Sequence, residues 1–146
     1  MNLIYGADEQ IAAWVVSNIP RMAGGVFGPG RAIGVADSAD RIIAGVVFHD
    51  YQPTCKTIQI SMAASTPKWA TRRTIAGLLR YPFHQLGVNK VWTASPASNT
   101  RAIRFNEGIG FKREAVLERH FGDDDAVICC MFVDEFNRRF APAILH

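Results

Sequence analysis

The chain lacks most of the features that mark secreted, metal-binding or membrane-spanning proteins. Its 146 residues include only three cysteines, an odd number without metal-type spacing to histidines, which argues against a disulfide framework and a zinc site. No apolar run approaches the length that crosses a bilayer. Residues 1–5 have neither the basic start nor the long apolar stretch of a signal peptide. We therefore expect reduced thiols, no metal ion and a cytoplasmic location.

The composition also lacks a large excess of charge. Apolar residues make up 49% of the chain and charged residues 20%, as is typical of a soluble globular protein, and we expect residues 1–146 to form a single domain. The net charge is +3, and two basic groups contribute to it: Lys68, Arg72, Arg73 and Arg80, and Arg101, Arg104, Lys112 and Arg113. Neither group alternates with aromatic residues as in proteins that bind single-stranded nucleic acid. A small anionic ligand explains both groups better, so we expect neither a nucleic-acid partner nor a membrane partner.

The spacing of apolar residues predicts the element order β-α-β-β-β-α-β-α-β-β. We expect strands over residues 1–5, 32–36, 41–50, 56–64, 90–95, 111–121 and 126–132, helices over residues 8–19, 72–86 and from Asn99 onward, and an amphipathic tail over residues 134–140. Asp8 can cap the first helix. Pro82 should bend or interrupt the second helix near Tyr81, because proline has no N–H to donate. Four glycines predict a loop over residues 22–31.

One segment carries a specific pattern. Between two expected strands stands Asn99-Thr-Arg-Ala-Ile-Arg-Phe105-Asn-Glu-Gly-Ile-Gly110-Phe111. It resembles the N-x-x-A-x-x-Y/F-x-x-x-G-F pattern of the GCN5-related N-acetyltransferase (GNAT) family, where this segment forms one wall of the acetyl-CoA site. The resemblance covers residues 40–133 and implies an α/β (α+β) GNAT fold. Such a fold has a mixed, mostly antiparallel central sheet of six to seven strands, helices on both faces, and a V-shaped splay between the two middle strands.

The resemblance also implies where acetyl-CoA, the co-substrate, would bind. The family's phosphate loop reads Q/R-x-x-G-x-G/A, whereas this chain has Thr66-Pro-Lys-Trp-Ala-Thr-Arg-Arg and no glycine. Trp69 with Arg72 resembles the W-x-x-G variant of ribosomal-protein acetyltransferases and related phage-encoded proteins, with arginine in place of glycine. The implied cofactor-binding residues are Met62, Ala63, Ala64, Lys68, Trp69, Ala70, Thr71, Arg72, Arg73, Thr74, Asn99, Arg101, Ala102 and Phe105. The plain alternative is a solvated helix start, with Asn99 acting only as a helix cap.

The residues that would perform acetyl transfer are less well marked. Phe105 stands where many relatives have a tyrosine that protonates the departing thiolate, which leaves the hydroxyls of Ser61, Thr93 and Ser95 as donors. No glutamate stands in the middle strands to act as a base. His49, Ser61 and His120 are our candidates for catalysis, since histidine titrates in the useful range. A histidine at a strand end also serves commonly as a surface or packing residue.

The function implied by the resemblance is an acetyl-CoA-dependent N-acyltransferase that moves an acetyl group to a primary amine by direct attack on the thioester. The acceptor would be a small-molecule or peptide amine, and a homodimer is left open. The alternative is a phage-related, GNAT-shaped binding or assembly protein that is catalytically weak or inactive. The missing glycines and Phe105 are the features that support this alternative. Glu114, on one of the last strands, is expected to be structural or to line the acceptor side.

Overall fold

The protein is described by a computed structural model over residues 1–19 and 30–144, with side chains described to residue 140. Seven strands form one sheet in the order β1-β2-β3-β4-β5-β7-β6. Their bounds are β1 Asn2–Ile4, β2 Gly30–Ala36, β3 Ile42–Gln52, β4 Thr57–Ala64, β5 Lys90–Pro96, β6 Lys112–Leu117 and β7 Ala126–Phe132. All neighbours are antiparallel except β4 and β5, which are parallel. The expected mixed, mostly antiparallel sheet is confirmed.

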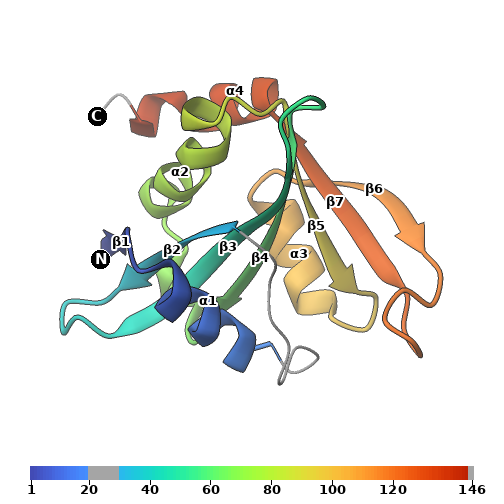
Figure 1. Cartoon of the computed structure of the whole chain (residues 1–146), viewed down its shortest axis with the longest axis horizontal. Helices are drawn as coiled ribbons and strands as arrows, with labels where there is room; N and C mark the ends of the chain where they lie inside the picture. Colours follow the sequence, from blue (N-terminus) through green and yellow to red (C-terminus); the bar gives the residue numbers. More distant parts are fainter. Residues whose placement is uncertain (20–29, 145–146) are drawn as a thin grey trace.

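Helices cover both faces of this sheet (Figure 1). The helix α1 (Asp8–Ser17) packs on one face, over β2 and β3. The other face carries α2 (Arg72–Arg80), α3 (Thr100–Gly108), α4 (Val133–Ile144), and the short turns η2 (Pro67–Trp69) and η3 (Tyr81–Gln85). Within the described residues no helix is both long and apolar enough to cross a bilayer.

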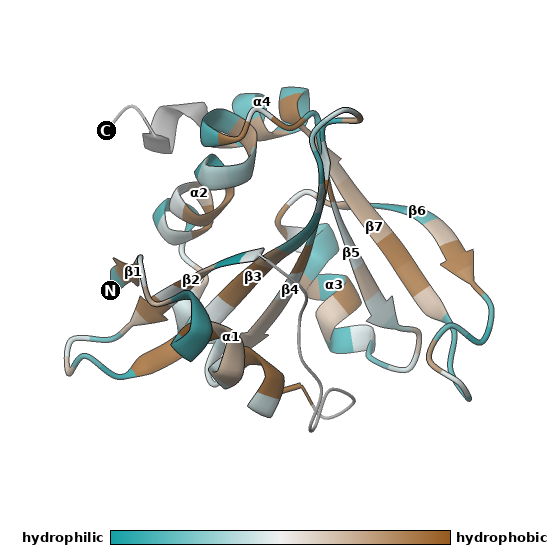
Figure 2. Ribbon diagram, viewed as in Figure 1, coloured by the Kyte–Doolittle hydropathy of each residue, from teal (hydrophilic) through white to brown (hydrophobic). Residues whose placement is uncertain are grey.

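The two-sided cover explains the continuous apolar sequence of the middle strands. Six consecutive residues of β3, from Ala44 to His49, are buried, and so are the first six of β7. Figure 2 shows the resulting hydrophobic colours along these two strands. All six residues of β6, at the sheet edge, are exposed. A strand covered on both faces loses the alternation of apolar and polar residues that a half-buried strand keeps.

Two paired glycines let α1 approach the sheet closely. Gly34 on β2 stands opposite Gly45 on β3. A Cβ at Gly34 would lie 2.5 Å from the Ile11 side chain, and a Cβ at Gly45 would lie 2.8 Å from that of Val15. The missing side chains therefore make a flat patch onto which Ile11 and Val15 pack.

Two details differ from the sequence prediction. Ala7, not Asp8, occupies the N-cap position of α1, and no side chain caps it. Asp8 is the first helical residue, and its carboxylate accepts the backbone N–H of Ala32 at 2.8 Å instead. The strand predicted over residues 111–121 ends at Leu117, because Arg119 adopts the left-handed φ of 53° in the following turn.

The interruption predicted near Tyr81 is confirmed. The α-helix ends at Arg80, and residues Tyr81–Gln85 continue as a single π turn. Pro82 cannot donate the N–H that an α-helix needs at that position. Most of the glycine-rich segment 22–31, predicted as a loop, lies outside the described residues; Gly30 and Arg31 already belong to β2.

The two middle strands form a fork. The parallel β4 and β5 pair over only three residues of each strand, Thr57 to Gln59 against Lys90 to Trp92. Beyond Gln59 the part of the chain that the structure describes pairs each strand with its outer neighbour only, β4 with β3 and β5 with β7. Figure 1 shows the two arrows close together at the start and well apart at their heads. The predicted splay between the middle strands is confirmed.

Candidate active site

Ser61 lies where the fork begins to open. Gln59 is the last residue of β4 that pairs with β5, and Ser61 follows it two positions later. Its side chain shares a sheet face with those of Val47 on β3 and Ala63 on β4, which belong to or pack against the cluster under α1. Ser61 therefore belongs to the α1 face of the sheet.

Ser61 ends a chain of three polar side chains on this face. Its hydroxyl lies 2.9 Å from Nε2 of His49, and Nδ1 of the same ring lies 2.6 Å from a carboxylate oxygen of Asp50. The His49 side chain is only 9% exposed, while that of Asp50 is 66% exposed. The chain thus leads from the opening of the fork through a buried imidazole to a carboxylate in solvent.

A β-bulge explains how two adjacent residues of one strand come to touch. In a regular strand the side chains of His49 and Asp50 would leave opposite faces. The register between β3 and β4 shifts between His49 and Gln52, and Asp50 has a left-handed φ of 54°. Such a bulge adds a residue to one strand and re-aims a side chain. Here it turns the Asp50 carboxylate back onto His49.

The hydroxyls on the β5 side of the fork face a different environment. Thr93 and Ser95 are buried, and the side-chain amide of Asn106 on α3 donates to them at 3.3 and 3.5 Å. Asn106 itself is 3% exposed. These hydroxyls, which the sequence offered as thiolate donors beside Ser61, thus hold α3 against the sheet.

The segment that replaces the glycine-containing phosphate loop is well ordered without glycine. The Thr66 hydroxyl accepts the N–H of Lys68 and caps η2, and the Thr71 hydroxyl accepts the N–H of Thr74 and caps α2. No residue between Thr66 and Thr74 has a positive φ, so the backbone does not require glycine here. The first turn of α2 holds Arg72 and Arg73 and no acidic residue.

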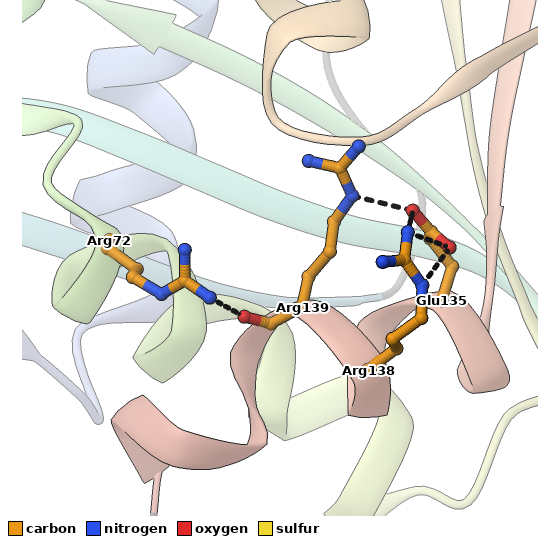
Figure 3. A network of polar contacts seen from close by, with 4 residues as sticks. All are labelled: Arg72, Glu135, Arg138 and Arg139. Atoms are coloured by element: carbon orange, nitrogen blue, oxygen red, sulfur yellow. Dashed lines mark hydrogen bonds and ion pairs between the residues drawn. The ribbon is translucent and has the colours of Figure 1, made fainter.

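Arg72 points toward α4, as Figure 3 shows. Its guanidinium donates to the backbone carbonyl of Arg139 and lies 5.7 Å from the ring centre of Phe140. Glu135 bonds the side chains of Arg138 and Arg139, and these bonds hold its pKa below the usual value. Arg72 therefore has an internal partner, whereas the sequence suggested either a phosphate contact or a solvated side chain.

The remaining residues predicted to bind the cofactor lie on β4, on α3 and on the segment from η2 to α2. Trp69 is buried, and its ring centre lies 5.5 Å from that of Phe105 on α3. Asn99 caps α3 by accepting the N–H of Ala102 at 3.2 Å, so the capping role is present. The others lie on β4 (Met62, Ala63, Ala64), on η2 (Lys68), between η2 and α2 (Ala70, Thr71), on α2 (Arg73, Thr74) and on α3 (Arg101).

Two residues considered from the sequence lie elsewhere. His120 is exposed in the turn between β6 and β7, at the sheet edge, and contacts the ring of Phe121. Glu114 bonds the Lys90 ammonium at 2.7 Å, which lowers the Glu114 pKa. His49 and Ser61 are brought together, and His120 is not.

Three further features of the described residues bear on the site. A polar groove of about 610 Å³ lies between β1 and α2; Thr71 and Arg73, both predicted to bind the cofactor, are among its lining residues, and Ser61 is not. Among the described residues no group of three metal-binding side chains occurs. Burial raises the pKa of the Cys129 and Cys130 thiols, which favours their neutral form.

Solved structures of a spermidine N-acetyltransferase have a similar fold. A variant of SpeG from Vibrio cholerae matches with a TM-score of 0.74 at 16% identity, over 94% of this chain and 99% of that one. A chimera of SpeG and hSSAT gives 0.76 at 15% identity, over 95% and 100%. The dodecameric SpeG structure gives 0.73 at 15% identity, over 94% and 96%. No protein-family model and no curated protein matches the sequence.

These matches and the strand order establish that the chain has the GNAT fold. They give no support to the ribosomal-protein or phage-encoded subtype suggested by Trp69 and Arg72. The sequence analysis did not predict the contact between Asp50 and His49 in the candidate site. No pattern could have indicated it, because the contact depends on a bulge that the alternation of residues conceals.

Proposed function

We propose that the protein is an N-acetyltransferase that transfers the acetyl group of acetyl-CoA to a primary amine. One observation carries the proposal: β4 and β5 separate after Gln59, and among the described residues no strand pairs with residues 60–64 of β4 on that side. An unpaired strand edge offers backbone N–H and C=O groups to an extended ligand. The pantetheine arm of coenzyme A is such a ligand, because its two amides can pair like an added strand.

The proposed binding site for the diphosphate of coenzyme A is the start of α2. A helix N-terminus carries partial positive charge and favours anions, so arginines in the first turn are poorly matched to the helix alone. Arg72 and Arg73 occupy that turn, without an acidic residue. A bound diphosphate would compensate both the helix dipole and the arginines.

The α3 side would hold the rest of the carrier. Trp69 and Phe105 form an apolar wall between η2 and α3. Lys68 precedes Trp69 in the sequence, Arg101 lies on the same helix as Phe105, and both cations are exposed. Phe105 has no proton to give, so the thiolate would leave without a tyrosine acid. Loss of general acid catalysis costs about 10²- to 10⁴-fold, and coenzyme A is a good leaving group that lessens this cost.

A small amine is our proposed acceptor, with spermidine and spermine as the first compounds to test. The matched structures are titled as spermidine N-acetyltransferases. The carboxylate of Asp50, exposed next to His49, would attract a cationic amine. We further propose a cytoplasmic enzyme of one domain, with a homodimer and a peptide amine acceptor as alternatives to examine.

The second candidate function is a GNAT-shaped binding or assembly protein without turnover. Two observations favour it: Phe105 replaces the acid, and Arg72 is already bonded to α4. In this case the fork would bind acetyl-CoA weakly and no amine would be acetylated.

Calorimetric titration with acetyl-CoA separates the two functions at their first step. We expect the wild type to bind acetyl-CoA. Arg73→Gln should weaken this binding about tenfold, the effect of one charge-assisted contact, and should leave the melting temperature of the protein unchanged. Arg72→Gln should weaken binding and also lower the melting temperature, because Arg72 docks α4. Absence of binding at millimolar acetyl-CoA would end the enzyme proposal.

Turnover is then measured as acetylated amine and free coenzyme A by chromatography. Thiol reagents are unsuitable because Cys55 is exposed. A panel of spermidine, spermine, a monoamine and a peptide with a free N-terminus identifies the acceptor class. Binding without any acetylation would favour the second function.

A further inference from the structure

His49 is held at both ring nitrogens by different partners. Asp50 accepts at Nδ1 and Ser61 contacts Nε2. A carboxylate is only an acceptor, so Nδ1 carries a proton, and in the neutral imidazole Nε2 is then the acceptor nitrogen. In this form of the ring the Ser61 hydroxyl donates to Nε2. This network selects the tautomer in which the imidazole can take a proton from the serine side.

The three hydrogen-bonded side chains Ser61, His49 and Asp50 lie where the thioester would react. Ser61 follows the last β4–β5 pair by two residues, so it stands at the closed end of the fork. If the carrier enters from the open end, its thioester comes to rest near Ser61. The imidazole is buried behind Ser61, and the Asp50 carboxylate is exposed beyond it.

The two other hydroxyls at the fork contact an amide instead of a base. Thr93 and Ser95 contact the side-chain amide of Asn106, which cannot take up a proton. The bulge in β3, with Asp50 in the left-handed region, is a second independent feature of the same site. Backbone strain of this kind occurs where the surrounding structure fixes a functional side chain.

We propose that Ser61, His49 and Asp50 form a proton relay that removes the proton from the attacking amine; this rests on the proposed acetyl transfer. The amine nitrogen forms a bond to the thioester carbonyl carbon, and the C–S bond breaks with its electron pair leaving on the coenzyme A thiolate. The nitrogen's proton passes to Oγ of Ser61 while the Ser61 proton passes to Nε2 of His49. Asp50, a positioning residue, orients the ring and stabilises the imidazolium, which then returns its proton to water.

The test uses wild-type protein and the variants His49→Gln, Ser61→Ala and Asp50→Asn, assayed at saturating acetyl-CoA. We expect His49→Gln to lower kcat about 10²- to 10⁴-fold, the usual contribution of a positioned base. Asp50→Asn should lower kcat about tenfold, since it loses orientation and charge but not the base. The Kd for acetyl-CoA should stay unchanged in each. Ser65→Ala is the matched control, because its hydroxyl contacts Ile43 outside the relay.

The double variant His49→Gln/Ser61→Ala gives the sharpest readout. Members of one relay act as a unit, so the double variant should be no slower than the slower single variant. Added imidazole should restore part of the activity of His49→Ala, and Ser61→Thr should restore most of the activity lost in Ser61→Ala. A role in folding alone predicts neither rescue.

Three results would overturn the relay while leaving acetyl transfer intact. The first is an active wild type whose kcat is insensitive to all three single substitutions. The second is multiplication of the two single effects in the double variant. The third is an acetyl group on Ser61 after incubation with acetyl-CoA alone, which would make Ser61 a nucleophile. A wild type that neither binds acetyl-CoA nor acetylates an amine would instead overturn the proposed function and the relay together.

Discussion

Two serines stand on opposite sides of the fork, and their surroundings differ. Ser61 on β4 contacts an imidazole whose other nitrogen is bonded to an exposed carboxylate. Ser95 on β5 is 7% exposed and contacts the amide of Asn106, which is 3% exposed. One hydroxyl has a path for a proton to solvent, and the other is part of a closed buried network.

This difference separates a reactive side of the fork from a structural side. Burial of a polar network rigidifies an element when every member has a partner, which suits the contact between α3 and β5. A base needs an accessible electron pair and a nearby charge to stabilise its protonated form, and the β4 side has both. The following predictions test this division.

The largest difference in kcat is expected between the two single variants in which either serine is replaced by alanine. Ser61→Ala should reduce kcat about a hundredfold, because the amine loses its route to His49. Ser95→Ala should change kcat by less than about threefold, within the range of a distant structural substitution. Initial rates with the best amine at saturating acetyl-CoA provide the comparison. Equal loss in both variants would contradict the division.

The next effect concerns the stability of the β5 side. Asn106→Leu leaves the Thr93 and Ser95 hydroxyls buried without the amide, and we expect a loss of about 2 kcal/mol in the free energy of unfolding. Asn99→Ala on the same helix removes only an exposed cap and should cost about 1 kcal/mol. Urea unfolding measures both. A smaller loss for Asn106→Leu than for Asn99→Ala would show that the buried network is not structural.

A proline pair distinguishes the two edges of β4. Ser65 donates its N–H to Ile43 on β3, and successive residues of a strand direct their N–H groups to opposite sides. The Ala64 amide therefore faces the fork and the Ala63 amide faces β3. Ala64→Pro should weaken acetyl-CoA binding by about 1 kcal/mol, the value of one hydrogen bond, and change the melting temperature little.

Ala63→Pro is the matched variant, because it removes an amide from the β3–β4 ladder. We expect it to lower the melting temperature clearly more than Ala64→Pro does. Calorimetry and thermal melting on the two proteins give the result. If Ala64→Pro leaves the Kd unchanged, the fork amides do not hold the pantetheine arm.

The smallest effect is a pH dependence away from the fork. The hydrogen bond from Lys90 holds the pKa of Glu114 below its usual value. Stability from this pair is therefore complete above the unfolded pKa and is lost as the pH falls through the folded one. Glu114→Gln should be less stable than wild type by under about 1 kcal/mol at neutral pH, as for exposed ion pairs. Urea unfolding should show this difference vanishing as the pH falls below the folded pKa of Glu114; a constant difference would contradict it.

Much of the fold could be predicted from local patterns. The alternation of apolar residues located β4, and the Asn99–Phe111 pattern located α3 and the turn at Gly110. Position 110 favours glycine for two reasons: its φ is 115°, and a Cβ there would lie 2.7 Å from the Arg139 side chain. Such requirements are local, so they leave a trace in the sequence.

The candidate site could be predicted only in part. His49 and Ser61 are twelve residues apart, and their contact follows from the β3–β4 register, which the sequence does not specify. The Asp50 contact depends on the bulge, and the docking of Arg72 on α4 joins residues 67 positions apart. Long-range register and side-chain direction are properties of the folded chain, so composition and spacing do not reveal them.

The most direct test of the whole account is a crystal structure of the protein with acetyl-CoA bound. We predict the pantetheine arm between residues 60–64 of β4 and the diverging end of β5, the diphosphate at the start of α2, and the thioester next to Ser61. Acetyl-CoA bound in the groove between β1 and α2, with the fork empty, would contradict the account.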